Sequence, residues 1–370
     1  MIIGVTGYGA TGASACMDLI KEFDGVQYYK PHVEFQLLQQ PDGIIDLHYN
    51  LVESRRRISI NAAIVRFIKR FEYKRSDRLS KKTNGQYVSL SRDYINSLIK
   101  VCWKGKSSYD PQDILSRFED TKYRYLRGVM KRIVWLFNPN SVWPKYNNRY
   151  YACVSEKEFV HKTRVYLDKI FKASGFDTKN PILLEQLFGL EKPTEGAEYF
   201  DDFRSIIVDR DPRDVYAMTN GYLSQQETSF MPNKGDVKAF VKYFKGLHHS
   251  HVNHPNVMYI NFEDLIYKYD ESLARLKDFL KLDHVNPKEF FKPEWSINNT
   301  RTYKNYPELK EDIKYIEREL KDYLYPFSDC ENNLSFVPEN TGVFDAKPGD
   351  NRDLIKRSQR VLKMRTKNSK

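Results

Sequence analysis

Apolar residues fall into short runs along the chain, and segments with helical spacing separate them. The first run, Ile2–Thr6, leads through the glycine-containing stretch 7–12 into Ala13–Phe23, where apolar residues recur every three or four positions. Further apolar runs occupy 181–184, 205–209 and 257–261. Strands that alternate with helices favour a parallel sheet. The pattern predicts a three-layer α/β fold with a central parallel sheet.

The pattern changes between residues 51 and 150. This segment is rich in Arg, Lys and aromatic residues, and it has helical spacing with few strand signals. We interpret it as a helical insertion or cap on a single α/β domain that spans 1–330. The remainder, 331–370, is polar and ends in a basic run, which predicts a C-terminal tail.

Net charge and composition limit the classes of binding partner that we expect. The chain has 370 residues and a formal net charge of +11, which favours anionic partners such as nucleotide phosphates or an acidic glycan. No nucleic-acid-binding module is evident. No run is apolar enough to span a bilayer, and Met1–Val5 reads as a core strand rather than a signal peptide. The four cysteines show no CxxC spacing, so we expect a cytoplasmic protein without a structural metal.

The glycine-containing stretch is a candidate anion site. Glycines allow main-chain N–H groups to approach a phosphate closely, and the following helix adds unpaired donors and a positive dipole end. The simpler interpretation is a tight strand-to-helix turn without a ligand. The candidate binding residues are Gly9, Ala10, Thr11, Gly12, Ala13 and Ser14.

This stretch matches one known nucleotide-binding pattern and lacks another. Gly7, Gly9 and Gly12 satisfy G-x-G-x-x-G, the dinucleotide fingerprint, and Glu34 lies where a ribose-binding acid would be expected. An NAD(P)-dependent oxidoreductase is therefore one alternative. Against it, residues 51–150 do not supply the further strand–helix units of such a domain. A Walker-type Gly-Lys-Ser/Thr is also missing from this stretch.

A second motif follows the strand at 205–209. Asp211 suits a helix N-cap, Pro212 suits the first helical position, and Asp214 lies where a capping-box acid would lie. Arg210 then stands at the carboxyl end of a strand, where open α/β sheets bind their ligands. Arg213 in the first helical turn opposes the helix dipole, which favours a specific role for it.

These segments resemble the sulfotransferases that use 3′-phosphoadenosine 5′-phosphosulfate. The block Arg-Asp-Pro-Arg-Asp-Val at 210–215 resembles their 3′-phosphate-binding segment. A later strand end, turn and helix end of the family are similar to Asn-Phe-Glu-Asp-Leu at 261–265 and Phe-Leu-Lys-Leu at 279–282. The family's 5′-phosphosulfate loop is similar in position to Thr-Gly-Ala-Ser at 11–14. The family usually has Lys or Arg where Ala10 stands, and Ser where Met218 stands.

The resemblance implies a P-loop NTPase-like fold and transfer of a sulfuryl group to a hydroxyl or amine acceptor, for which a glycan is our first expectation. It implies that 3′-phosphoadenosine 5′-phosphosulfate is the donor and that no metal is needed. Besides the loop, the expected nucleotide-binding residues are Arg210, Arg213, Thr219 and Arg301.

The family uses His or Glu as general base for the acceptor proton. His48 is the first candidate here, with Glu34 and Asp46 behind it, because all three follow the first strand–helix unit. A structural role for His48 is the alternative. The histidines at 248, 249, 251 and 254 have no Cys or acidic residues nearby at a spacing that suits a metal site. We therefore expect their side chains to pack against other residues or to be solvated.

Two further alternatives stay open at this point. The departures at Ala10 and Met218 are compatible with a protein that binds nucleotide without turnover. A phosphoryl-transferring relative with an atypical phosphate loop is the other.

Overall fold

The computed structural model describes most of the chain. The described residues are 1–73, 78–105, 121–138, 147–222, 231–232, 235–249, 251–330 and 334–339. Most of the predicted C-terminal tail lies outside this set. Contacts divide the chain into two compact units, Met1–Phe35 with Lys179–Lys370, and Gln36–Thr178.

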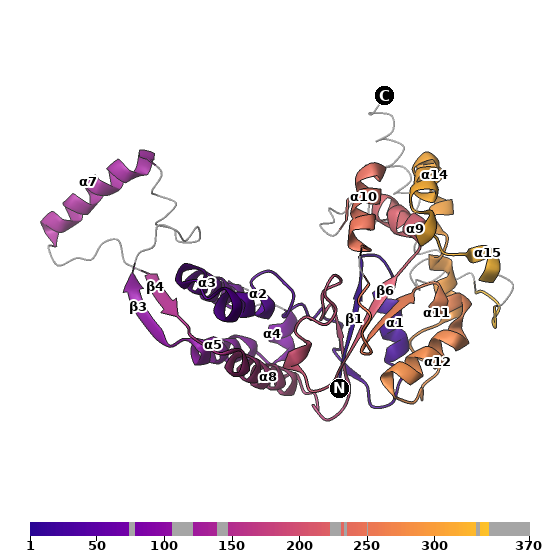
Figure 1. The fold of residues 1–370 in the computed structure, drawn as a ribbon, viewed down its shortest axis with the longest axis horizontal. Coiled ribbons are helices and arrows are strands. Elements are labelled where there is room, and N and C mark those ends of the chain that lie inside the picture. The colour runs from indigo at the N-terminus through magenta and orange to yellow at the C-terminus, as the bar shows by residue number, and fades with distance from the viewer. Residues whose placement is uncertain are drawn as a thin grey trace. The chain divides into compact units, whose positions relative to one another are not determined.

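A five-stranded parallel sheet forms the centre of the first unit, in the order β2-β5-β1-β6-β7. The strands are β1 (Ile2–Gly7), β2 (Gln27–Tyr28), β5 (Ile182–Glu185), β6 (Phe203–Asp209) and β7 (Val257–Asn261). Helices flank this sheet (Figure 1), so the predicted α/β class with a central parallel sheet is confirmed. The strand β2 is only two residues long and pairs with β5.

The helices of the first unit are α1 (Ala13–Ile20), α9 (Pro212–Ala217), α10 (Val237–Leu247), α11 (Asp264–Tyr267), α12 (Tyr269–Leu280), α13 (Pro293–Ser296), α14 (Lys310–Glu319) and α15 (Phe327–Cys330). A π-helical turn, Met218–Tyr222, follows α9 directly.

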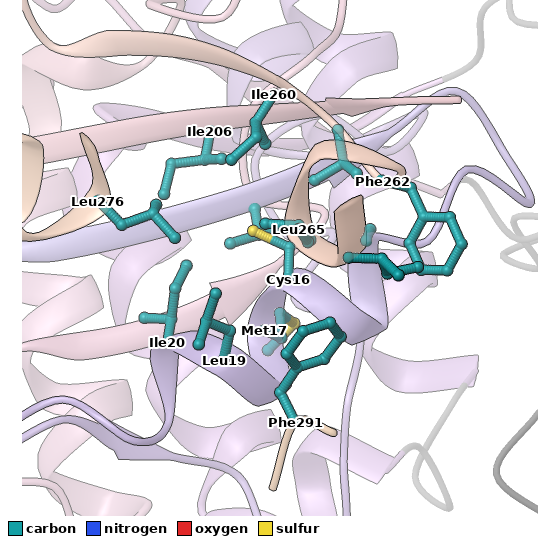
Figure 2. Close-up of a cluster of buried hydrophobic side chains, with 14 of the residues drawn as sticks. Cys16, Met17, Leu19, Ile20, Ile206, Ile260, Phe262, Leu265, Leu276 and Phe291 are labelled. Atoms are coloured by element: carbon teal, nitrogen blue, oxygen red, sulfur yellow. The ribbon is translucent and has the colours of Figure 1, made fainter. Parts of the chain in front are cut away.

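One face of the sheet packs against α1, α11 and α12. Cys16, Met17 and Ile20 are spaced along one side of α1, and they share a buried cluster with Ile206 of β6 and Ile260 of β7 (Figure 2). Burial raises the pKa of the Cys16 thiol to about 12, so this cysteine stays protonated and packs as an apolar group.

The opposite face of the sheet meets α10. Val208 belongs to the cluster around α1, and successive strand residues point to opposite faces, so Asp209 points away from α1. The Asp209 carboxylate meets His248 at the end of α10. The connections that leave β1 and β6 therefore run on opposite faces. Such a switch point between neighbouring strands leaves a crevice at their carboxyl ends, where open α/β sheets bind ligands.

The second unit is mainly helical and includes the whole of the segment 51–150. It contains α2 (Ile44–His48), a π-helical turn (Tyr49–Ser54), α3 (Arg57–Tyr73), α4 (Arg78–Lys82), α5 (Tyr87–Leu98), α7 (Thr121–Phe137) and α8 (Glu156–Ala173). Its strands β3 (Val101–Gly105) and β4 (Asn147–Tyr151) pair antiparallel in a two-stranded sheet that the helical pattern did not predict. Among the helices that the structure describes, none has the length and apolar character to cross a membrane.

Candidate functional site

The loop between β1 and α1 has an unusual backbone. Gly9, Ala10 and Gly12 have positive φ angles of 88°, 56° and 87°. A Cβ added at Gly12 would lie 2.5 Å from Cδ2 of Phe262, so the loop needs glycine there for its angle and for space. Gly12 is the N-cap of α1 and gives no side-chain cap, which leaves main-chain donors at this helix end for an anion.

The two hydroxyl residues of the loop have different environments. Thr11 is buried, and its Oγ1 donates to the carbonyl oxygen of Val208 at 2.7 Å and accepts from the Tyr8 N–H at 3.1 Å. Thr11 thus ties the loop to β6. Ser14 is exposed in the first turn of α1, next to the buried Ala13, and it is the loop hydroxyl that is open to a ligand.

Arg210 joins the second motif to this loop. Its side chain is only 4% exposed, and its Nη1 donates to the carbonyl oxygen of Ala10 at 2.8 Å. Nη2 donates to the carbonyl oxygen of Asn299, and the guanidinium lies 5.1 Å from the centre of the Phe262 ring. Nε is buried and has no hydrogen-bond partner among the described residues. A fixed positive charge therefore stands beside the glycine loop at the switch point.

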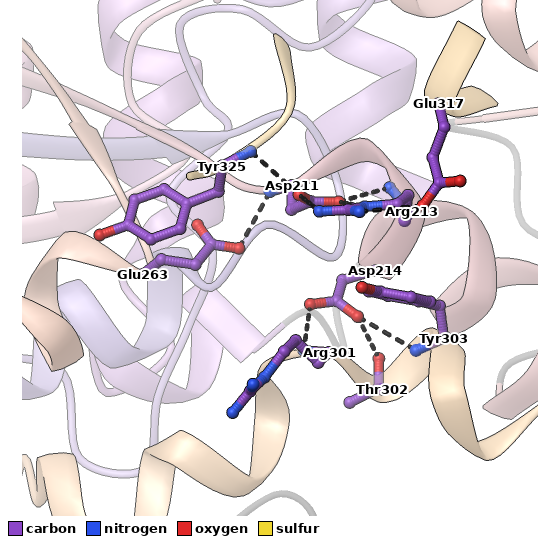
Figure 3. A network of polar contacts seen from close by, with 9 residues as sticks. All are labelled: Asp211, Arg213, Asp214, Glu263, Arg301, Thr302, Tyr303, Glu317 and Tyr325. Carbon is purple, nitrogen blue, oxygen red and sulfur yellow. Dashed lines mark hydrogen bonds and ion pairs between the residues drawn. The ribbon is translucent and has the colours of Figure 1, made fainter. Parts of the chain in front are cut away.

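Asp211 and Arg213 form an ion pair that fixes the start of α9 (Figure 3). The Asp211 carboxylate accepts from the Arg213 N–H at 2.9 Å, from Arg213 Nη2 at 2.7 Å and from the Tyr325 N–H at 3.0 Å, which confirms the predicted N-cap. Arg213 Nη1 also donates to Glu317 at 3.0 Å. Burial alone lowers the pKa of Arg213, but its bonds to Asp211 outweigh this and raise the pKa. The Arg213 guanidinium is thus held by two carboxylates.

Asp214 positions the segment that carries Arg301. Its carboxylate accepts from the Arg301 N–H at 2.6 Å, the Thr302 hydroxyl at 2.9 Å and the Tyr303 N–H at 3.1 Å. The predicted capping box is therefore wrong, because Asp214 does not reach back to the N–H of Asp211. In Figure 3 the Arg301 guanidinium points away from Asp214, and it lies 5.5 Å from the Phe327 ring centre.

Glu263 takes the place that the capping box would have filled. It is fully buried and accepts from the Asp211 N–H at 3.0 Å, while its second carboxyl oxygen has no partner among the described residues. Burial raises its pKa well above the usual range, and the charge of Arg210 offsets only part of this rise. Glu263, which follows β7, therefore supports the start of α9, which follows β6.

Thr219 lies in the π-helical turn after α9. It is fully buried, and its hydroxyl bonds to the carbonyl oxygens of Val215 and Tyr216, both at 3.1 Å. Met218, at the position of the family's serine, is also buried. The Thr219 hydroxyl thus stabilises the turn itself.

The three candidate bases are divided between the two units. Glu34 belongs to the first unit, where it forms an isolated bridge with Glu185. His48 and Asp46 lie on α2 of the second unit. The His48 ring stacks on Phe159 at 4.7 Å, and Asp46 accepts from the N–H of Asp42 at 2.6 Å.

His32 and Glu185 form an ion pair that the sequence did not single out. Glu185 ends β5, which lies directly beside β1. The hydrogen bond to Glu185 raises the pKa of His32, against a smaller opposing effect of burial. From the sequence, Glu185 could have been noticed as a carboxylate at the end of a predicted strand. Its partner His32 could not, because it lies more than 150 residues away in the sequence.

The histidine cluster packs against aromatic rings. His248 stacks between Tyr8 at 4.0 Å and Phe244 at 3.9 Å, and its Nε2 lies 3.0 Å from Asp209. His251 stacks on Tyr259. Within the described residues there is no group of three His, Cys, Asp or Glu side chains placed to hold a metal ion.

A pocket of about 480 Å³ opens where β6 and β7 end. Its wall carries the side chains of Asp209, Asp211, Asp264 and Asp322 together with His248, His251 and Lys268. Four aspartates against one lysine make this pocket a poor environment for phosphate groups. An anion is better placed at the glycine loop, beside Arg210.

Comparisons with known proteins give two distant structural similarities. No family model and no curated protein sequence matches the chain. The sulfotransferase domain from the curacin biosynthetic pathway aligns over 88% of this chain and 98% of its own length, with 13% identity and a TM-score of 0.34. A retinol dehydratase in complex with androsterone and inactive cofactor PAP aligns over 99% and 80%, with 13% identity and a TM-score of 0.26. At these TM-scores, any argument about function has to come from the chain itself.

Proposed function

We propose that the chain is a sulfotransferase that moves a sulfuryl group from 3′-phosphoadenosine 5′-phosphosulfate to a hydroxyl or amine acceptor. One observation carries the proposal. Arg210, at the end of β6, is buried and hydrogen-bonded to Ala10 of the loop that ends β1. Two strand ends at a topological switch point thus bring main-chain donors and a guanidinium together, at the edge of the sheet where open α/β folds bind their ligands.

The residues present fit such a donor. The N-terminal turn of α1 and Ser14 would hold the phosphosulfate end, because this helix end lacks a side-chain cap. Arg210, whose Nε has no partner among the described residues, and Arg301 would hold the 3′-phosphate. Arg213 acts through Asp211 as a positioning residue, since both of its carboxylate partners are within 3.0 Å.

The bound donor would supply the sulfuryl group, and the chain must supply charge and proton transfer. The main-chain donors at the N-terminus of α1 would stabilise negative charge as it grows on the leaving 5′-phosphate, while Arg210 holds the 3′-phosphate. A base must take the acceptor proton. Glu34 is the sequence candidate in the same unit as the loop, and the His32–Glu185 pair lies at the end of the strand beside β1.

The strand order disfavours the oxidoreductase alternative. In a dinucleotide-binding domain the strand after the first helix lies next to the first strand, and its acid binds the ribose. Here β5 lies between β1 and β2. Glu34 therefore does not follow a strand that neighbours β1, although Gly7, Gly9 and Gly12 satisfy the fingerprint.

We infer a glycan as the first acceptor to test, because a net charge of +11 and 14% aromatic residues suit an acidic sugar chain. The test is transfer of labelled sulfate from the donor to a panel of hydroxyl- and amine-bearing acceptors. Transfer to any acceptor supports the proposal. Nucleotide binding without transfer to any of them would support the alternative of a binding protein that has no turnover.

A further inference from the structure

Helix α7 exposes an apolar surface at its C-terminal half. The side chains of Trp135, Leu136 and Phe137 are 60%, 73% and 87% exposed. Val129, Met130 and Ile133 on the preceding turns are exposed as well. Single exposed apolar side chains are ordinary, but six within nine residues are a concentration that indicates a partner.

The same helix is strongly basic. The segment Thr121–Phe137 has five Lys or Arg residues and no Asp or Glu. Positions 129, 133 and 136 follow one side of a helix, whereas positions 124, 127 and 131 follow the other. Arg132, between these two sets, is exposed. The helix is therefore amphipathic, with an apolar side and a cationic side.

The apolar side and the basic side of α7 together indicate which kind of partner it binds. A nucleic acid would account for the basic residues and leave the apolar surface in water. A second copy of α7 would cover the apolar surface and bring two clusters of positive charge together. An anionic lipid surface satisfies both, because apolar side chains enter the acyl boundary while Lys and Arg meet the headgroups. Phe137, four residues after Ile133 on the apolar side, is a residue type that favours this boundary.

We propose that α7 lies in the plane of an anionic membrane surface and attaches the chain to it peripherally. The helix has 17 residues and is basic along its length, so it rests in the interface and does not cross the bilayer. This inference does not depend on the proposed sulfotransferase activity. If both hold, the enzyme acts on acceptors displayed at a membrane.

The direct test is flotation of the full-length chain with vesicles. One vesicle population is phosphatidylcholine alone, and the other contains about a third phosphatidylglycerol. We expect the chain to float with the anionic vesicles at low salt and at least roughly tenfold less with the neutral ones, with binding that weakens as salt rises. No flotation with anionic vesicles at low salt would overturn the proposal.

Two pairs of variants separate α7 from the rest of the basic surface. Leu136→Glu should lower binding roughly tenfold, whereas Val165→Glu, which changes an exposed apolar residue of α8, should leave it unchanged. Arg132→Glu should lower binding by a similar factor, and Lys157→Glu on α8 should have a much smaller effect. All four side chains are exposed, so the unfolding temperature should stay constant.

Three outcomes would contradict the proposal. Equal binding by Leu136→Glu and the wild type would show that the apolar side of α7 does not enter the lipid. Equal affinity for a soluble polyanion such as RNA, again unaffected by Leu136→Glu, would show that charge alone acts. A dimer in the absence of lipid that Leu136→Glu dissociates, together with no vesicle binding, would identify a second copy as the partner.

Discussion

At the scale of single residues, the loop depends on glycine for two separate reasons. Gly12 has a φ of 87°, and an added Cβ would lie 2.5 Å from Phe262. The sequence predicted the need for unusual angles from the glycines alone. It could not predict the second reason, because Phe262 comes from a turn 250 residues further along the chain.

We predict that Gly12→Ala lowers the free energy of unfolding by roughly 2–4 kcal/mol, through the left-handed backbone and the clash together. Chemical denaturation measures this. Gly246→Ala is the matched control, because Gly246 lies in α10 and no described atom lies within 4 Å of its added Cβ. It should change stability by less than about 1 kcal/mol. Equal effects of the two substitutions would contradict the packing of the loop on Phe262.

Glu263 makes stability depend on pH. Burial raises its pKa in the folded chain, whereas in the unfolded chain its pKa is the ordinary one of about 4.3. Above that pH the unfolded chain loses this proton and the folded chain keeps it, so this residue's contribution to stability falls as pH rises towards the folded pKa.

Glu263→Gln should remove this dependence and keep an acceptor for the Asp211 N–H. We expect the stability of the variant relative to wild type to increase with pH, by up to about 1.4 kcal/mol per pH unit above about pH 4.5. Urea unfolding between about pH 5 and pH 8 measures it. Parallel stability curves would show that Glu263 is ionised in the folded chain.

At the scale of elements, local signals located the strands and the start of α9 well. The predicted N-cap Asp211 and first-turn Pro212 both hold in the structure. The partners of these residues could not be predicted, because Arg213 meets Glu317 and Asp211 meets Tyr325, each more than 100 residues away. Such contacts depend on how α14 and the following chain fold back onto α9.

Asp211 should therefore contribute more to the free energy of unfolding than an ordinary N-cap does. We predict that Asp211→Ala lowers the free energy of unfolding by roughly 3–5 kcal/mol, because the Arg213 guanidinium, whose side chain is only 11% exposed, loses its main partner. Asp236→Ala removes the N-cap of α10, which is exposed and has one bond to Ala239, and should cost about 1 kcal/mol. Denaturation midpoints of the two variants measure the difference. Similar losses would mean that the ion pair adds nothing to the cap.

At the scale of the whole molecule, strand order decides which nucleotide class fits. The sequence predicted a parallel sheet, and the glycine spacing suited a dinucleotide equally well. Only the assembled sheet shows that β5 separates β1 from β2. Strand order could not be predicted because the segment between β2 and β5, 29–181, includes the entire second unit.

This order makes a prediction about ligands. Titration with NADH or NADPH should give no saturable change in nicotinamide fluorescence at micromolar to millimolar concentration. Saturable binding that Gly12→Ala abolishes would favour the oxidoreductase alternative and contradict our interpretation of the sheet.

The central claim is that Arg210 and the loop at 7–12 together hold one adenosine nucleotide, and calorimetric titration with adenosine 3′,5′-bisphosphate tests it most directly. We expect saturable binding by the wild type and an affinity roughly tenfold to a hundredfold lower for Arg210→Lys. Arg204→Lys, at the opposite end of β6, should bind as the wild type does. Absence of binding by the wild type, or equal affinity of all three proteins, would contradict the account.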